Sequence, residues 1–138
     1  MFQDHSPEVN AKLEEALEAA LEAVGNQAVS HAKSIITRES RVDTGALRNS
    51  VNHAVDMDEK CVYVGTNMEY AIYHEFGTGI YTDGGRGRQS PWAYQDAKGN
   101  WHRTRGIKPI HFLRDAVQDH IKEYQQIMEA EIRNRMAT

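Results

Sequence analysis

The sequence has few of the residues that build disulfide-linked or membrane-anchored proteins. Only one of its 138 residues is cysteine, Cys61, so no internal disulfide can form. No run of about 18 apolar residues occurs, which argues against a membrane-spanning helix. Residues 1–7 lack the basic start and the apolar core of a secretory signal. These absences favour an ordinary soluble protein from a reducing, cytosolic compartment, with Cys61 as a buried and unreactive thiol.

Length and composition predict a single domain over residues 1–138, because a chain of this size can bury one core. The net charge of -4 is unevenly placed. Residues 1–36 hold six acidic and two basic residues, net -4, whereas residues 80–108 hold six basic and two acidic residues, net +4. This separation indicates that the basic segment faces an acidic partner, either nucleic acid or the acidic surface of a neighbouring copy.

Two long helices are predicted, one towards each end of the sequence. Between residues 6 and 36 apolar residues recur every three, four or seven positions, which is the spacing of one helix face. Ser6 is a suitable cap for this helix, and Gly25 permits a bend within it. A similar stripe predicts a second helix that Pro109 opens and that runs to about Arg135.

Shorter elements are predicted between these helices. Residues 51–57 and 61–65 alternate in polarity on either side of a short polar turn, which predicts an antiparallel hairpin. Residues 69–76 form a short helix whose aromatic side chains would anchor it to the sheet. Gly77 is placed to end that helix in a left-handed conformation.

Residues 78–108, called the insertion below, are rich in glycine and arginine and show no helical stripe. Within the insertion, residues 92–95 and 101–104 flank a turn that contains Gly99, and this pattern predicts a second hairpin. The predicted order is therefore helix, hairpin, short helix, long insertion and helix.

No catalytic or metal-binding pattern is complete. His74 and Glu75 begin the zinc motif His-Glu-x-x-His, but Thr78 stands where the second histidine belongs and Gly77 should already have ended the helix. The Asp-Thr-Gly of residues 43–45 lacks the lysine of a phosphate-binding loop, so a helix cap is its predicted role. The seven histidines show no ligand pair of recognisable spacing. We therefore expect no metal, no cofactor and no enzymatic activity.

The insertion is the better candidate for function. Its arginines lie on both sides of Trp92, Tyr94 and Trp101 in the sequence, and such a set can bind single-stranded nucleic acid by charge and stacking. Alternatively, the aromatic side chains hold the hairpin together while the basic groups meet an acidic protein surface. The negative net charge and the absence of a nucleic-acid-binding motif favour this second interpretation.

Four motifs, in this order, resemble one protein family. They are residues 42–51 (VDTGALRNSV), 64–67 (VGTN), 70–79 (YAIYHEFGTG) and 109–116 (PIHFLRDA). Together they are similar to the gene-product-ten-like tail-component proteins of long-tailed bacteriophages and prophages, also called neck or tail-completion proteins. The resemblance runs from about residue 6 to the C-terminus.

The resemblance implies an α+β fold: a small antiparallel β-sheet packed against two long helices, with a short central helix and the insertion. It implies a structural, non-catalytic protein of the virion tail or neck, assembled in the cytoplasm of the bacterial host. The implied partners are copies of the chain in a ring thought to be sixfold, the connector or head-closure protein and the tail tube. Contact with DNA in the lumen is a further implied option.

We therefore predict a head–tail joining protein that has no active site and that binds partners through the insertion. The alternative is a nucleic-acid-binding module that uses the same residues. The predicted partner-binding residues are Glu75, Gly77, Thr78, Gly79, Arg86, Arg88, Trp92, Trp101, Arg103 and Arg105. The predicted structural motif comprises Asp43, Thr44, Gly45, Leu47, Arg48, Tyr70, Phe76, Pro109, Phe112 and Leu113.

Overall fold

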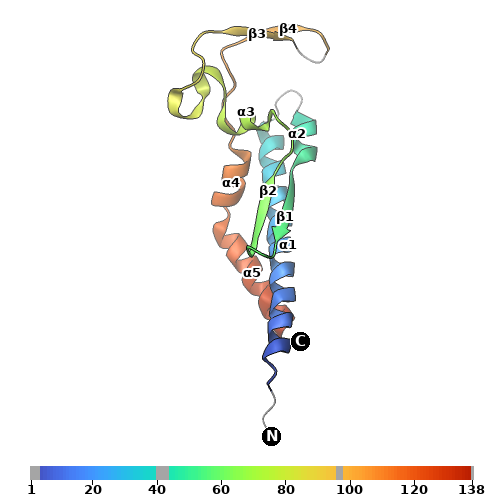
Figure 1. Cartoon of the computed structure of the whole chain (residues 1–138). Helices are drawn as coiled ribbons and strands as arrows, with labels where there is room; N and C mark the ends of the chain where they lie inside the picture. Colours follow the sequence, from blue (N-terminus) through green and yellow to red (C-terminus); the bar gives the residue numbers. More distant parts are fainter. Residues whose placement is uncertain (1–3, 40–43, 96–97, 138) are drawn as a thin grey trace.

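A computed structural model describes residues 4–39, 44–95 and 98–137. The fold mixes helices with two small antiparallel sheets and is 59% helical, so the predicted α+β class is confirmed. Figure 1 shows an elongated molecule in which the start of α1 and the end of α5 lie at one end and the insertion at the other. The elements are α1 (Ser6–Glu39), α2 (Thr44–Ser50), β1 (Asn52–Asp56), β2 (Cys61–Gly65), α3 (Ala71–Phe76), the 3-10 turns η1 (Gly79–Tyr81) and η2 (Asp83–Gly85), β3 (Trp92–Gln95), β4 (Trp101–Thr104), α4 (Phe112–Gln118) and α5 (Ile121–Met136).

The long helix α1 is the element against which the rest of the body packs. It contacts α2, α4, α5 and both strands of the first hairpin. Ser6 is the first helical residue rather than the cap, and the side chain of Asp4 accepts the Ser6 backbone N–H at 2.9 Å. Hydrogen bonds from the hydroxyl and the backbone N–H of Ser6 lower the pKa of Asp4. Within the described ranges, no helix is both long and apolar enough to span a bilayer.

Gly25 lies inside α1, which continues through it. A Cβ atom at Gly25 would lie 2.4 Å from Cδ2 of the His53 ring and 2.9 Å from Cγ2 of Val62. Both of these residues belong to the hairpin. The glycine therefore serves the close approach of the sheet to the helix and not a bend.

The first hairpin has the predicted pairing. Strands β1 and β2 are antiparallel, with Asn52 opposite Gly65 and Asp56 opposite Cys61. Cys61 is half-buried rather than buried, and its Sγ lies 3.8 Å from the carboxylate of Glu59. The prediction of a buried thiol is therefore wrong, because Cys61 sits at the exposed turn end of β2.

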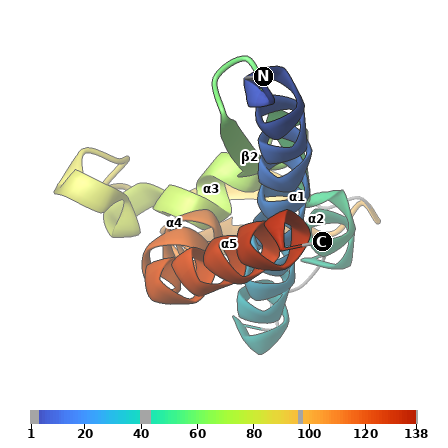
Figure 2. The same cartoon turned by 90° about the horizontal axis from the view of Figure 1, so that it is seen from below.

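The core forms two clusters along α1. The cluster nearer the insertion contains Leu47, Phe112 and Ile36, which are the largest fully buried side chains, and Tyr70 and Leu113 pack against it. The second cluster joins the hairpin and α5 to the middle of α1. Its members are Val24, Ala28, Val62, Val64, Tyr124, Ile127 and Met128. Figure 2 shows α5 crossing α1, with the hairpin alongside α1.

The C-terminal helix predicted from Pro109 is wrong in two respects. It begins at Phe112, because His111 adopts a left-handed conformation with φ 49°. It is also broken after Gln118 and resumes at Ile121 as α5.

The break is stabilised by a change of hydrogen-bond partners. In an unbroken helix the His120 N–H would bond to the carbonyl of Ala116. It bonds instead to the carbonyl of Val117 at 3.4 Å, and the hydroxyl of Tyr124 donates to the Ala116 carbonyl. The buried carbonyl of Ala116 thus keeps a hydrogen-bond donor. Apolar spacing in the sequence cannot reveal this change of donor. Burial, together with the charge of Glu123, raises the pKa of Tyr124 to about 12.

Candidate functional site

Glu75 connects α3 to the start of α4. Its side chain is 5% exposed, and its two oxygens accept the backbone N–H groups of Leu113 and Arg114, both at 2.9 Å. The first N–H groups of a helix have no partner within the helix, and a negative charge suits that end of the helix dipole. Both carboxylate oxygens of this predicted partner-binding residue are therefore used within its own chain, as a cap of α4.

The end of α3 has the positive φ expected of Gly77. Its φ is 79°, with an extended ψ of 172°, and its N–H donates to the Tyr73 carbonyl at 2.8 Å. The predicted anchoring of α3 by its aromatic side chains is wrong for Tyr73 and Phe76, which are 53% and 49% exposed. Tyr70 alone of these three packs against the core.

The two ends of the insertion meet in a short stem. The N–H of Thr78 donates to the Ile107 carbonyl at 3.0 Å, and the Ile107 N–H donates to Oγ1 of Thr78 at 2.9 Å. A Cβ atom on Gly79 would lie 1.8 Å from the carbonyl oxygen of Arg105, and one on Gly106 would lie 1.9 Å from that of Thr78. The glycines therefore allow the two backbones to touch, and the insertion is fixed to the body at this stem.

Beyond the stem, the second hairpin pairs as predicted, with Trp92 opposite Thr104 and Gln95 opposite Trp101. The described part of the insertion projects from the helical body (Figure 1). The guanidinium of Arg88 lies 5.5 Å from the centre of the Trp92 ring, whereas Trp101 is 70% exposed. The four arginines predicted to bind a partner are all exposed: Arg86, Arg88, Arg103 and Arg105.

An aromatic cleft of about 590 Å³ lies where the insertion meets α3. The sequence gives no local signal for it, because its walls come from three separated segments. Its lining residues are Tyr70, Tyr73, Thr78, Trp92, Tyr94, Thr104 and Ile107. The cleft brings predicted motif and insertion residues together on one surface.

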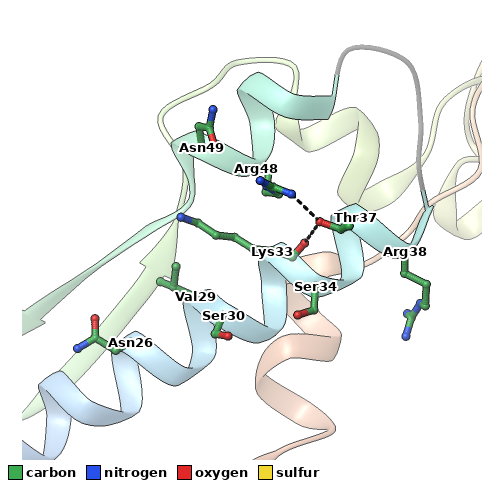
Figure 3. A pocket seen from close by; sticks show the side chains of 9 residues that line it. All are labelled: Asn26, Val29, Ser30, Lys33, Ser34, Thr37, Arg38, Arg48 and Asn49. Atoms are coloured by element: carbon green, nitrogen blue, oxygen red, sulfur yellow. Dashed lines mark hydrogen bonds between the residues drawn. The ribbon is translucent and has the colours of Figure 1, made fainter.

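A polar groove of about 680 Å³ lies between α1 and α2 and holds Arg48 of the predicted motif (Figure 3). Nη1 of Arg48 donates to Oγ1 of Thr37 at 3.1 Å, and that hydroxyl donates to the carbonyl of Lys33 at 2.9 Å. Figure 3 shows the side chains of Lys33, Arg38 and Arg48 pointing in different directions. They do not converge on one ligand.

The remaining residues of the predicted structural motif differ in how far they are buried. Pro109 is half-buried and lies next to Gly77. A Cβ atom added to Gly77 would lie 2.9 Å from Cδ of Pro109. Gly45 is exposed, and a Cβ on it would meet no described atom within 4 Å, so no close contact requires glycine at this position. Thr44 begins α2, and the predicted cap at Asp43 lies outside the described residues.

One side-chain cluster was not predicted from the sequence. His31 Nε2 lies 2.9 Å and His120 Nδ1 lies 3.3 Å from the same oxygen, Oε2 of Glu123. The two imidazole rings are stacked, with centroids 3.5 Å apart and an angle of 8° between their planes. His120 and Glu123 are three positions apart at the start of α5, but His31 joins them only through the packing of α1 against α5.

This architecture defines a small α+β domain whose prominent features are a helical body and a projecting basic and aromatic insertion. The family model described as "Bacteriophage HK97-gp10, putative tail-component" matches residues 2–77. Since the match covers more than half of the 138 residues, the chain belongs to this family of phage tail components. No curated protein and no solved structure matches the chain.

The family match ends at residue 77, one residue before the stem of the insertion. It therefore includes the motifs at 42–51 and 64–67 and most of the motif at 70–79. The resemblance predicted for residues 109–116 lies outside the matched range and stays a prediction.

Proposed function

We propose that this protein is a neck or tail-completion subunit that joins the head of a long-tailed phage or prophage to its tail. Family membership supports a structural role in the tail. In this proposal the chain acts as one subunit of a ring, is assembled in the host cytoplasm and performs no catalysis. The observation that carries the proposal is the basic insertion, which is clamped at its stem and projects from the helical body.

The opposite ends of the molecule carry opposite charge. Exposed acidic residues occupy the first half of α1, whereas the exposed arginines of the insertion lie at the far end (Figure 1). The acidic residues are Glu8, Glu14, Glu15, Glu18 and Glu22. In a ring of copies that all point the same way, like ends lie side by side. We therefore infer that the insertion faces a different component, namely the connector or head-closure protein, the tail tube or DNA in the lumen.

The test replaces the four insertion arginines by serine together and measures the joining of heads to tails. We expect joining to fail while the helical body keeps its melting temperature, because the four arginines are exposed and lie in the insertion, outside the core clusters. A matched control removes four cations from the body: Arg38, Arg114, Lys122 and Arg133. If both variants join equally well, the insertion is not the joining surface.

The ring is tested separately by native mass spectrometry of the assembled particle or of the purified chain. A closed ring requires a heterologous contact between neighbours. A complex that stops at an antiparallel dimer, in which each basic end meets the acidic end of its partner, would contradict the ring.

Direct binding of nucleic acid is the second candidate. The observation in its favour is Trp101, which is the most exposed large hydrophobic side chain of the described residues and lies near the exposed Arg103. A stacking platform with neighbouring cations would bind single strands with an affinity that falls steeply with salt. Titration of the protein into labelled single-stranded and double-stranded DNA at near-physiological ionic strength tests direct nucleic-acid binding. Absence of salt-sensitive binding would contradict this second candidate function.

A further inference from the structure

We propose that His31, His120 and Glu123 bind a divalent transition-metal ion, for which zinc is the best fit, and that this ion fastens α1 to the start of α5. The three side chains come from segments about ninety positions apart and meet only in the folded chain. Their ligand atoms all lie within 4.8 Å of one another. The proposed ion would bind in the helical body, away from the insertion.

The spacing of the ligand atoms suits a small ion. Ligands that lie 2.0–2.1 Å from a tetrahedral zinc ion are about 3.3 Å apart. The observed separations from Oε2 of Glu123 are 2.9 Å to His31 and 3.3 Å to His120. The two ring planes are nearly parallel, so the rings must rotate out of their stacked arrangement before both nitrogen lone pairs can point at one ion. The ion would replace the two N–H···O contacts that now hold the cluster together.

A fourth side chain orients the carboxylate. Nε2 of Gln27 donates to Oε1 of Glu123 at 2.8 Å, which leaves Oε2 directed at the two imidazoles. Partners of this kind fix the orientation of metal ligands in many proteins.

The donor set selects the class of ion. Two imidazoles and one carboxylate suit zinc and other first-row transition metals, whereas calcium and magnesium prefer oxygen ligands alone. The side chains of His31, His120 and Glu123 are 22%, 32% and 37% exposed, so solvent can reach the ion and supply a fourth ligand. None of the clefts described above includes these three residues, and we assign the ion a structural role.

The test is a titration of the full, untagged chain with cobalt(II) and then with zinc. We expect cobalt to give the intense visible absorption of a tetrahedral site at one ion per chain, and zinc to displace it. Zinc, but not magnesium, should also raise the melting temperature, because the ion binds only the folded arrangement. A weak spectrum of six-coordinate cobalt, or no uptake, would overturn the proposal without any variant.

Variants then assign the ligands. His31→Gln, His120→Gln and Glu123→Gln should each weaken zinc binding by at least about tenfold, the scale of effect seen even for outer-shell partners. His5→Gln is the matched control, since His5 lies 2.9 Å from Glu8 in an exposed pair that has no described third ligand. Unchanged zinc affinity in the three cluster variants, or an equal loss in the control, would contradict the assignment.

Discussion

Glu75 and Leu113 lie 38 positions apart, yet the carboxylate of Glu75 accepts the backbone N–H of Leu113 at 2.9 Å. Because the same carboxylate also accepts the N–H of Arg114, one buried side chain ties the short central helix to the C-terminal helices. The insertion leaves the body between these two points. The cap therefore holds together the two elements that flank the insertion.

Replacement of Glu75 by alanine should lower the free energy of unfolding by about 1–3 kcal/mol, the cost of leaving buried donors without a partner. Glu75→Gln should cost less, since the amide oxygen can still accept one of the two N–H groups. Denaturant unfolding measures both. Glu69→Ala, which removes an exposed carboxylate of the same segment, is the control. Equal stability of the Glu75→Ala and Glu69→Ala variants would show that the cap is not stabilising.

Gly79→Ala should open the stem of the insertion. The new Cβ would overlap the carbonyl of Arg105, and the φ of 61° is itself unfavourable for alanine. Strain of this kind costs about 1–3 kcal/mol. Hydrogen exchange should then show faster exchange at the Thr78 and Ile107 amides and unchanged protection in α1. Gly65→Ala, where a Cβ meets no described atom within 4 Å, should leave all these amides unchanged.

Gly25→Ala should destabilise the protein, although the same change inside an exposed helix would stabilise it. Alanine gains about 1 kcal/mol of helix propensity over glycine. Overpacking costs about 1–3 kcal/mol, and here the new Cβ would lie 2.4 Å from the His53 ring. The sign should reverse in a His53→Ala, Val62→Ala background, because both side chains that a Cβ at Gly25 would meet are then shortened. If thermal melting shows Gly25→Ala to be stabilising in both backgrounds, the hairpin does not press on the helix.

Tyr124→Phe should destabilise the protein by about 1–3 kcal/mol at neutral pH, because the buried carbonyl of Ala116 loses its donor. Folding raises the pKa of Tyr124 from 10.0 to about 12. The stability that the protonated Tyr124 hydroxyl contributes is therefore complete below pH 10 and is lost as the pH rises towards 12. The variant should therefore lose less stability over that alkaline range than the wild type.

The alkaline comparison needs a background without Tyr63. A hydrogen bond to Glu59 raises the pKa of Tyr63 to about 12 as well, so both phenols titrate in the same range. Tyr63 is exposed, and Tyr63→Phe should leave stability at neutral pH unchanged. In the Tyr63→Phe background, the loss of stability above pH 10 should be smaller when Tyr124 is also replaced by phenylalanine. An equal loss in both proteins would contradict the role of the Tyr124 hydroxyl as donor to the Ala116 carbonyl.

Local patterns were sufficient for the elements that repeat a simple period. The apolar spacing of α1 and the alternation in the first hairpin gave nearly correct boundaries, because each pattern reports on the side of the element that faces the core. The second hairpin was predicted instead from the turn around Gly99. Gly77 was likewise predicted as the end of α3 from its position after the aromatic residues. These predictions depend on neighbours within a few positions.

Contacts between distant segments lay beyond this reasoning. The apolar spacing from Leu113 to Ile132 continues across the break at Asp119 and His120. The reason for the break is visible only in the hydrogen bonds, because the Ala116 carbonyl accepts the hydroxyl of Tyr124 in place of the His120 N–H. The cluster around Glu123 depends in the same way on the packing of α1 against α5. Sequence spacing could place His120 near Glu123, but it could not place His31.

The stem also bears on how this protein can evolve. Since Thr78 and Ile107 already lie within hydrogen-bond distance, the chain between them can lengthen, shorten or change charge at little cost in loop-closure entropy to the body. The family match ends at the edge of this stem. The segment between Thr78 and Ile107 can therefore change in length or charge without rearrangement of the helical body to which it is attached.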